Sequence, residues 1–175
     1  NTIFNEIVVN YGITRPNEIL NLTNKKLIAL LQQEKEENLD DGMAVSIALL
    51  DRENLTLQFA GANQNSLIVR NRQTIALKGD KYPVGGAHYD PNRTYNCQTV
   101  LLEPEDIMYS FSDGFRDQFG GPKNKKFLGA NFYEMLLENS RKSMEIQKEV
   151  ILGVFNNWRG ECEQIDDVSI VGLKV

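Results

Sequence analysis

Two acidic segments stand directly at the boundaries of apolar, strand-like runs. Asp113 follows the run 107–112, and the pair Asp166 and Asp167 precedes the run 168–175. If these runs are antiparallel neighbours, the end of one lies beside the start of the other, and Asp113 and Asp166 share one edge of a sheet. Carboxylates brought together repel one another unless a cation sits between them. Hard oxygen ligands of this kind suit Mg²⁺ or Mn²⁺.

The alternative interpretation of these acids is structural. Asp-Gly pairs are common in turns, and an acid can solvate the end or edge of a strand. Taken alone, Asp40 and Asp41 in "DDG" at 40–42 are explained by a turn before a strand. A zinc site is disfavoured because the chain has one histidine, His88, and two separate cysteines that form no CxxC motif.

The hydrophobic pattern predicts an α+β fold. Helical spacing predicts helices near 3–8, after Thr14 as N-cap, over 130–139 and after Ser143. A period of two predicts strands, the middle ones as an antiparallel meander, over 43–49, 55–59, 66–70, 74–77, 95–102, 107–112 and 168–175. Strands flanked by pairs of helices favour antiparallel sheet covered by helices.

Composition narrows the classes of function. The chain has 175 residues, of which 41% are hydrophobic and 25% charged, as in a single soluble domain. A net charge of −5 argues against a nucleic-acid partner, which would need a basic surface. No uncharged apolar run is long enough to span a membrane, so this segment is expected to make no membrane contact. The isolated cysteines favour a reducing, cytoplasmic setting.

Five motifs, in order, resemble one family. They are "DDGM" at 40–43, "FAGANQ" at 59–64, "KYPVGG" at 81–86, "YSFSDGFRDQFGG" at 109–121 and "QIDDVSIVGLKV" at 164–175. This set resembles the PPM-type metal-dependent serine/threonine phosphatases, in their bacterial SpoIIE-like branch. The resemblance implies antiparallel β-sheets sandwiched between helices (α-β-β-α) and a two-metal centre of Mn²⁺ or Mg²⁺. It also implies hydrolysis of phosphoserine or phosphothreonine by metal-activated water, with no protein nucleophile.

The resemblance also implies roles for individual residues. Asp113 and Asp166 match metal ligands, and Asp167 takes a supporting position beside Asp166. Gly114 is expected to let the chain turn sharply after Asp113.

Further supporting positions are implied less directly. Asp117 and Gln118 fall in the same "SDG" stretch, and Asp41 falls in "DDGM". Asn63 ends a strand in "AGAN", where a structural turn explains it equally well.

The sequence also departs from the family pattern. An early Asp and a "GHG" loop are missing, so residues 1–175 are interpreted as one phosphatase domain, incomplete at its N-terminus. Without the Asp that bridges both metals, this fragment alone is expected to be weakly active or inactive. Ala44 replaces an acid in "DGMA".

Two hypotheses for function stay open. The first is a cytoplasmic phosphatase, part of a larger sensor protein, acting on a regulatory phosphoprotein such as an anti-anti-sigma-type protein. The second is a degenerate phosphatase domain that binds a partner or regulates it. An apolar face on the first, shortened helix also suggests a homodimer.

Overall fold

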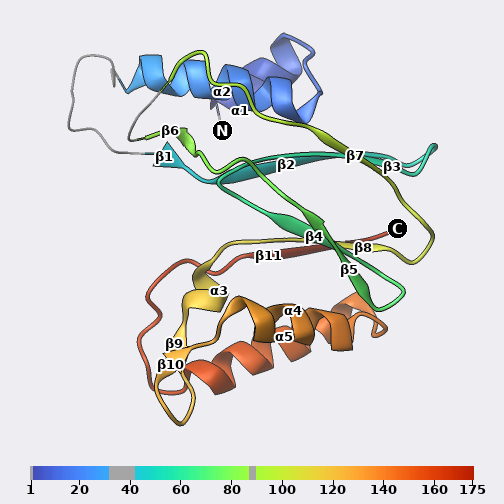
Figure 1. The fold of residues 1–175 in the computed structure, drawn as a ribbon, viewed down its shortest axis with the longest axis vertical. Coiled ribbons are helices and arrows are strands. Elements are labelled where there is room, and N and C mark those ends of the chain that lie inside the picture. The colour runs from blue at the N-terminus through green and yellow to red at the C-terminus, as the bar shows by residue number, and fades with distance from the viewer. Residues whose placement is uncertain (1, 32–41, 87–89) are drawn as a thin grey trace. The chain divides into compact units, whose positions relative to one another are not determined.

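The computed structural model describes residues 2–31, 42–86 and 90–175 (Figure 1). The chain divides into two compact units: Asn1–Ser66 with Leu77–Leu102, and Leu67–Ala76 with Glu103–Val175. Each unit contains antiparallel sheet and helices, which confirms the predicted α+β class. Among the described residues, no helix combines the length and apolar character needed to cross a membrane.

The first unit packs helix α2 against a three-stranded sheet. Its helices are α1 (Thr2–Asn5), the π-helix η1 (Glu6–Asn10) and α2 (Pro16–Leu30), and its sheet has the order β2 (Val45–Asp51), β3 (Thr56–Ala62) and β7 (Gln98–Leu101). Short strands β1 (Gly42–Met43) and β6 (Val84–Gly85) pair beside them. The buried core includes Leu20, Ala60 and Tyr95.

Two expectations in this unit have clear outcomes. The hairpin is confirmed, because β2 and β3 pair antiparallel from Val45 opposite Ala62 to Asp51 opposite Thr56. The expected N-cap at Thr14 is wrong: Arg15 takes that position, with ψ 126° and no side-chain cap bond. A residue before proline is held in extended conformation, so helix α2 begins at Pro16.

The second unit holds the candidate site residues Asp113, Asp166 and their neighbours in sequence. Its sheet has the order β11 (Ile170–Lys174), β8 (Ile107–Phe111), β4 (Ser66–Arg70) and β5 (Gln73–Leu77). The other elements are α3 (Gly114–Asp117), β9 (Phe119–Gly120), β10 (Lys125–Lys126), α4 (Gly129–Asn139) and α5 (Met144–Arg159). Within this unit, α4 and α5 cover one face of the sheet (Figure 1).

The predicted meander of the middle strands is wrong in its connections. Strands β4 and β5 belong to the sheet of β8, whereas β2, β3 and β7 form another. Leu67, Ile68 and Val69 are all buried, as expected for an inner strand with both faces covered. A period of two predicts a strand but does not say which sheet the strand joins.

An aromatic core fixes the second unit. Phe115 lies within 5.0–5.2 Å, between ring centroids, of Phe127, Phe132 and Phe155. Phe127 in turn meets Trp158 edge-on at 5.2 Å. Edge-to-face contacts of this kind add stability beyond the buried area. Helix α3, which follows Asp113, is therefore anchored through Phe115 to α4 and α5.

Candidate metal centre

The predicted pairing of the two acid-flanked strands is confirmed. Strand β11 pairs antiparallel with β8, from Ile170 opposite Phe111 to Lys174 opposite Ile107. The ladder continues for one more bond, in which the Ser112 amide donates to the Ser169 carbonyl at 3.0 Å. Asp113 therefore leaves β8 at the end of the sheet where Asp166 and Asp167 enter β11.

Two close contacts join these acidic segments. The Ser112 hydroxyl donates to the Asp167 carbonyl at 2.8 Å and accepts from the Ser169 amide at 2.9 Å. A Cβ on Gly114 would lie 2.4 Å from the same Asp167 carbonyl oxygen, which a side chain cannot do. Gly114 is therefore explained by close approach of the backbones. It begins helix α3, directly after a bend of the backbone at Asp113.

The Asp113 carboxylate extends into solvent at the N-terminal end of α3. Its backbone carbonyl accepts from the Asp117 amide at 3.0 Å, but its side chain makes no capping hydrogen bond. Within the described part of the chain, the Asp113 carboxylate has no hydrogen-bond or ion-pair partner. Both oxygens are therefore available to a ligand.

The Asp166 carboxylate is similarly exposed. Its Oδ1 accepts from the Asp167 amide at 2.7 Å, and no described Lys or Arg forms an ion pair with it. The Asp166 carbonyl accepts from Gln164 Nε2 at 2.9 Å, which holds the loop just before β11. Asp167 contributes only backbone atoms to these contacts, its carbonyl to Ser112 and its amide to Asp166.

The remaining predicted residues have different surroundings. Asp117 Oδ1 lies 3.2 Å from Lys126 Nζ, so its charge is already paired. Asn63 belongs to the other unit, where its φ of 52° and its amide bond to the Asp80 carbonyl at 2.8 Å describe a turn. Asp40, Asp41 and His88 lie outside the described residues, so the expectation for Asp41 is not tested.

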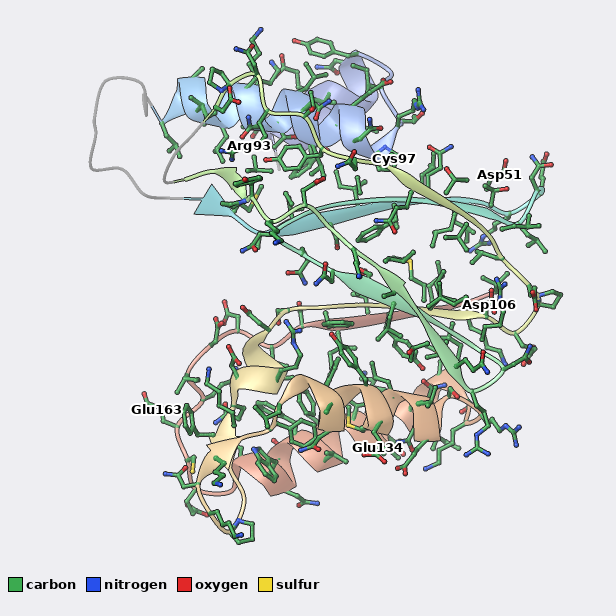
Figure 2. All side chains as sticks on the ribbon, in the orientation of Figure 1. Asp51, Arg93, Cys97, Asp106, Glu134 and Glu163 are labelled. Carbon is green, nitrogen blue, oxygen red and sulfur yellow. The ribbon has the colours of Figure 1, made fainter. Side chains whose placement is uncertain are left out.

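Acids also stand at the opposite end of β8, where their environment differs. Asp106, which precedes β8, is 1% exposed, and its carboxylate accepts a bidentate pair from Arg70 at 3.0 Å (Nε) and 2.6 Å (Nη2). The Glu103 amide donates to the same carboxylate at 2.9 Å. This hydrogen-bonded pair raises the pKa of Arg70. Figure 2 labels Asp106 at this end, and Glu163 on the loop that leads to Asp166.

The chemistry of the donors at the Asp113 end fits a hard divalent cation. Carboxylate oxygens without a basic partner are the ligands that Mn²⁺ and Mg²⁺ take in proteins. In residues 2–31, 42–86 and 90–175, no group of three or more His, Cys, Asp or Glu side chains is placed to hold a metal ion. Asp113 and Asp166 thus fit as part of a ligand set.

Ser112 is the contact residue that sequence reasoning missed. A serine directly before an acid at a strand end is common, so its type gives no signal. Its place opposite Ser169 is visible only once the register of β8 and β11 is known.

The comparisons with known proteins agree on one fold. The SiaA-PP2C domain of Pseudomonas aeruginosa is 25% identical with a TM-score of 0.85, covering 99% of this chain and 66% of that one. The RsbU and RsbW domains of a Mycobacterium tuberculosis protein match at 14% identity and a TM-score of 0.69, covering 99% and 45%. The catalytic domain of the serine/threonine phosphatase PstP, in complex with two manganese ions, matches at 14% and 0.56, covering 89% and 68%.

No curated protein sequence matches the chain. The family model described as "Stage II sporulation protein E (SpoIIE)" matches residues 2–175. The match spans all five motifs, including the strands that flank Asp113 and Asp166. The chain therefore belongs to the SpoIIE family of PPM-type, PP2C-like phosphatase domains.

Proposed function

We propose that this chain is part of a metal-dependent protein serine/threonine phosphatase, in which Asp113 and Asp166 each donate carboxylate oxygens to Mn²⁺ or Mg²⁺. The observation that carries the proposal is their shared position. Both acids are exposed at one end of the β8–β11 ladder, their segments touch through Ser112 and Gly114, and neither has a cationic partner in the described chain.

A bound pair of divalent cations would supply a hydroxide-like water for attack on phosphorus and would neutralise charge on the phosphoryl oxygens. The chain's own part is to bring the two segments that carry these carboxylates to one end of the β8–β11 ladder. Asp113 is fixed by helix α3, whose Phe115 is buried in the aromatic core. Asp166 is fixed by the bonds of its neighbours, Gln164 and Asp167.

The proposal of two metals is supported by the match to PstP, whose solved structure contains two manganese ions. Two carboxylates do not fill the six oxygen positions that Mg²⁺ or Mn²⁺ usually takes. The proposal therefore includes further oxygen ligands, from water and from residues beyond Asp113 and Asp166. We treat residues 1–175 as part of one such domain, because they span 66% of the SiaA-PP2C chain.

The substrate proposed is a phosphoserine or phosphothreonine on a regulatory protein. The match to a chain that carries RsbU and RsbW domains supports a signalling protein of the anti-anti-sigma type as that substrate. A cytoplasmic location, within a larger sensor protein, is proposed with it.

The test is Mn²⁺-dependent hydrolysis of a phosphoserine peptide by the full protein. Asp113→Asn keeps the size of the side chain and removes its charge, so we expect Mn²⁺-dependent turnover to be lost. Glu134→Gln is the matched control, because Glu134 is an exposed acid on α4, away from the β8–β11 end (Figure 2). Equal turnover in Asp113→Asn and wild type would contradict the proposal.

A second candidate function is a degenerate phosphatase domain that binds a partner. One observation favours it: Ala44 stands in "DGMA", where the family pattern has an acid. The same assay separates the two functions, since a binding module would show no Mn²⁺-dependent turnover in the wild type either.

A further inference from the structure

Gln118 is a fully buried polar residue just past helix α3. Its side chain is 0% exposed, and its Nε2 donates to the carbonyls of Phe119 and Glu163, each at 2.9 Å. The Glu163 carbonyl lies 45 residues away in sequence, on the loop that carries Asp166. One amide group thus joins the segment of Asp113 to the segment of Asp166.

The backbone carbonyl of Gln118 accepts two further hydrogen bonds. Its carbonyl accepts from the Phe127 amide at 3.0 Å and from Trp158 Nε1 at 3.1 Å. The chain then runs so close to the end of α5 that a Cβ on Gly120 would lie 1.9 Å from the Trp158 carbonyl oxygen. Gln118 is therefore a fixed point from which the Glu163 loop can be positioned.

Two sets of side-chain hydrogen bonds, which we call ties, connect the segments 112–118 and 163–169. The first is Ser112, bonded to the Asp167 carbonyl and the Ser169 amide. The second is Gln118, bonded to the Glu163 carbonyl. Asp113 lies between the ties on one segment and Asp166 lies between them on the other. The two segments that carry the acids are therefore held together on both sides of Asp113 and Asp166.

We infer that Gln118 is a positioning residue of the proposed metal centre, which acts by holding the Glu163–Asp167 loop beside Asp113. The inference rests on the proposed function. Residues that orient metal ligands from outside the coordination sphere typically change metal affinity about 10- to 100-fold when replaced. Gln118 touches neither carboxylate, so its effect is expected through the loop alone.

The chain offers a matched control in Gln147. This glutamine is also buried in the second unit, at 2% exposed, and its Nε2 also donates to backbone carbonyls, those of Ser140 and Lys142. Its Oε1 accepts from the Tyr109 hydroxyl, whose pKa burial raises to about 12, so the phenol remains a donor. None of these bonds reaches the segments 112–118 or 163–169.

The experiment titrates Mn²⁺ into the full protein and follows free Mn²⁺ by electron paramagnetic resonance. Gln118→Met and Gln147→Met both remove buried hydrogen bonds, and both are expected to lower the Tm. Only Gln118→Met is expected to weaken Mn²⁺ affinity, by about tenfold. Equal Mn²⁺ affinity in the two variants, with comparable losses of Tm, would show that Gln118 is structural only and would overturn the inference.

Two further variants keep the test decisive. If Gln118→Met does not fold, Gln118→Asn keeps a buried amide but draws the donor back from the Glu163 carbonyl, and an unchanged Mn²⁺ affinity in that variant overturns the inference. Asp113→Asn reports on the proposed function: wild-type affinity in that variant would remove the metal centre and this inference with it. Loss of binding in Asp113→Asn with unchanged affinity in Gln118→Met would overturn the inference alone.

Discussion

The two ends of strand β8 carry acids in opposite electrostatic situations. At the start of the strand, Asp106 is buried and its charge is matched by Arg70 and by the Glu103 amide. At its end, Asp113 is exposed and lies at the same end of the sheet as Asp166, with no cation from the described chain. An acid at a strand end is therefore structural where the fold supplies its counter-charge. Where the fold supplies none, the exposed acid is solvated and is free to bind an external cation.

We call the Asp106 end of β8 the paired end and the Asp113 end the unpaired end. The largest effect is expected at the unpaired end. Asp166→Asn removes one of the two carboxylate charges, and we expect Mn²⁺-dependent hydrolysis of a phosphopeptide to be abolished. Asp167→Asn should cause a smaller loss, because Asp167 makes its contacts to Ser112 and Asp166 through its backbone. A steady-state assay of both variants checks this order. A greater loss of hydrolysis in Asp167→Asn than in Asp166→Asn would show that Asp167, and not Asp166, is the ligand.

The paired end should respond in stability and not in metal binding. Asp106→Asn leaves the partly buried Arg70 with only its ion pair to the Glu103 carboxylate at 2.9 Å, at an expected cost of about 2 to 3 kcal/mol in the free energy of unfolding. Glu105→Gln is the comparison, since its ion pair with Lys174 is exposed and contributes at most about 1 kcal/mol. Urea denaturation measures both variants. A stability loss in Asp106→Asn no larger than in Glu105→Gln would break the contrast between the two ends.

The close approach at the unpaired end gives the next effect. Gly114→Ala places a methyl group against the Asp167 carbonyl, and we expect a loss of about 2 kcal/mol in stability together with weaker Mn²⁺ binding. Gly153→Ala on α5 is the control, because nothing lies within 4 Å of its Cβ position. There the added helix propensity should stabilise by up to about 1 kcal/mol. Thermal unfolding of the two variants should shift in opposite directions.

The smallest effect is expected for Asp113→Asn in the metal-free protein. No capping bond or ion pair with a described residue is lost, so the free energy of unfolding should stay within about 0.5 kcal/mol of wild type. Chemical denaturation in the presence of a chelator measures the free energy of unfolding of Asp113→Asn and wild type. A loss as large as that of Asp106→Asn would show that Asp113 is a structural acid.

Sequence reasoning located the acids of the unpaired end but could not distinguish them from those of the paired end. The alternation over 107–112 and 168–175 was sufficient to predict two neighbouring strands, because their hydrophobic period is clear. By the same logic Asp106, which also borders β8, would qualify as a candidate ligand. Its partner Arg70 lies on another strand, 36 residues earlier, and only the sheet order shows that they meet.

The parts of the fold that sequence reasoning missed depend on long-range contacts. The division of the strands between two sheets depends on which strands pair, and the spacing of residues within each strand does not encode that pairing. The need for glycine at 114 comes from a carbonyl 53 positions later, which no local pattern reveals. The resemblance to the SpoIIE-like family drew attention to Gln118, but its bond to Glu163 had no sequence signal.

Calorimetric titration of Mn²⁺ into the full protein tests the central claim most directly. Wild type, Asp106→Asn and Asp113→Asn should be compared at a temperature where all three are folded. The account predicts Mn²⁺ binding with similar affinity in wild type and Asp106→Asn, and loss of that binding in Asp113→Asn. Undiminished Mn²⁺ affinity in Asp113→Asn would contradict it.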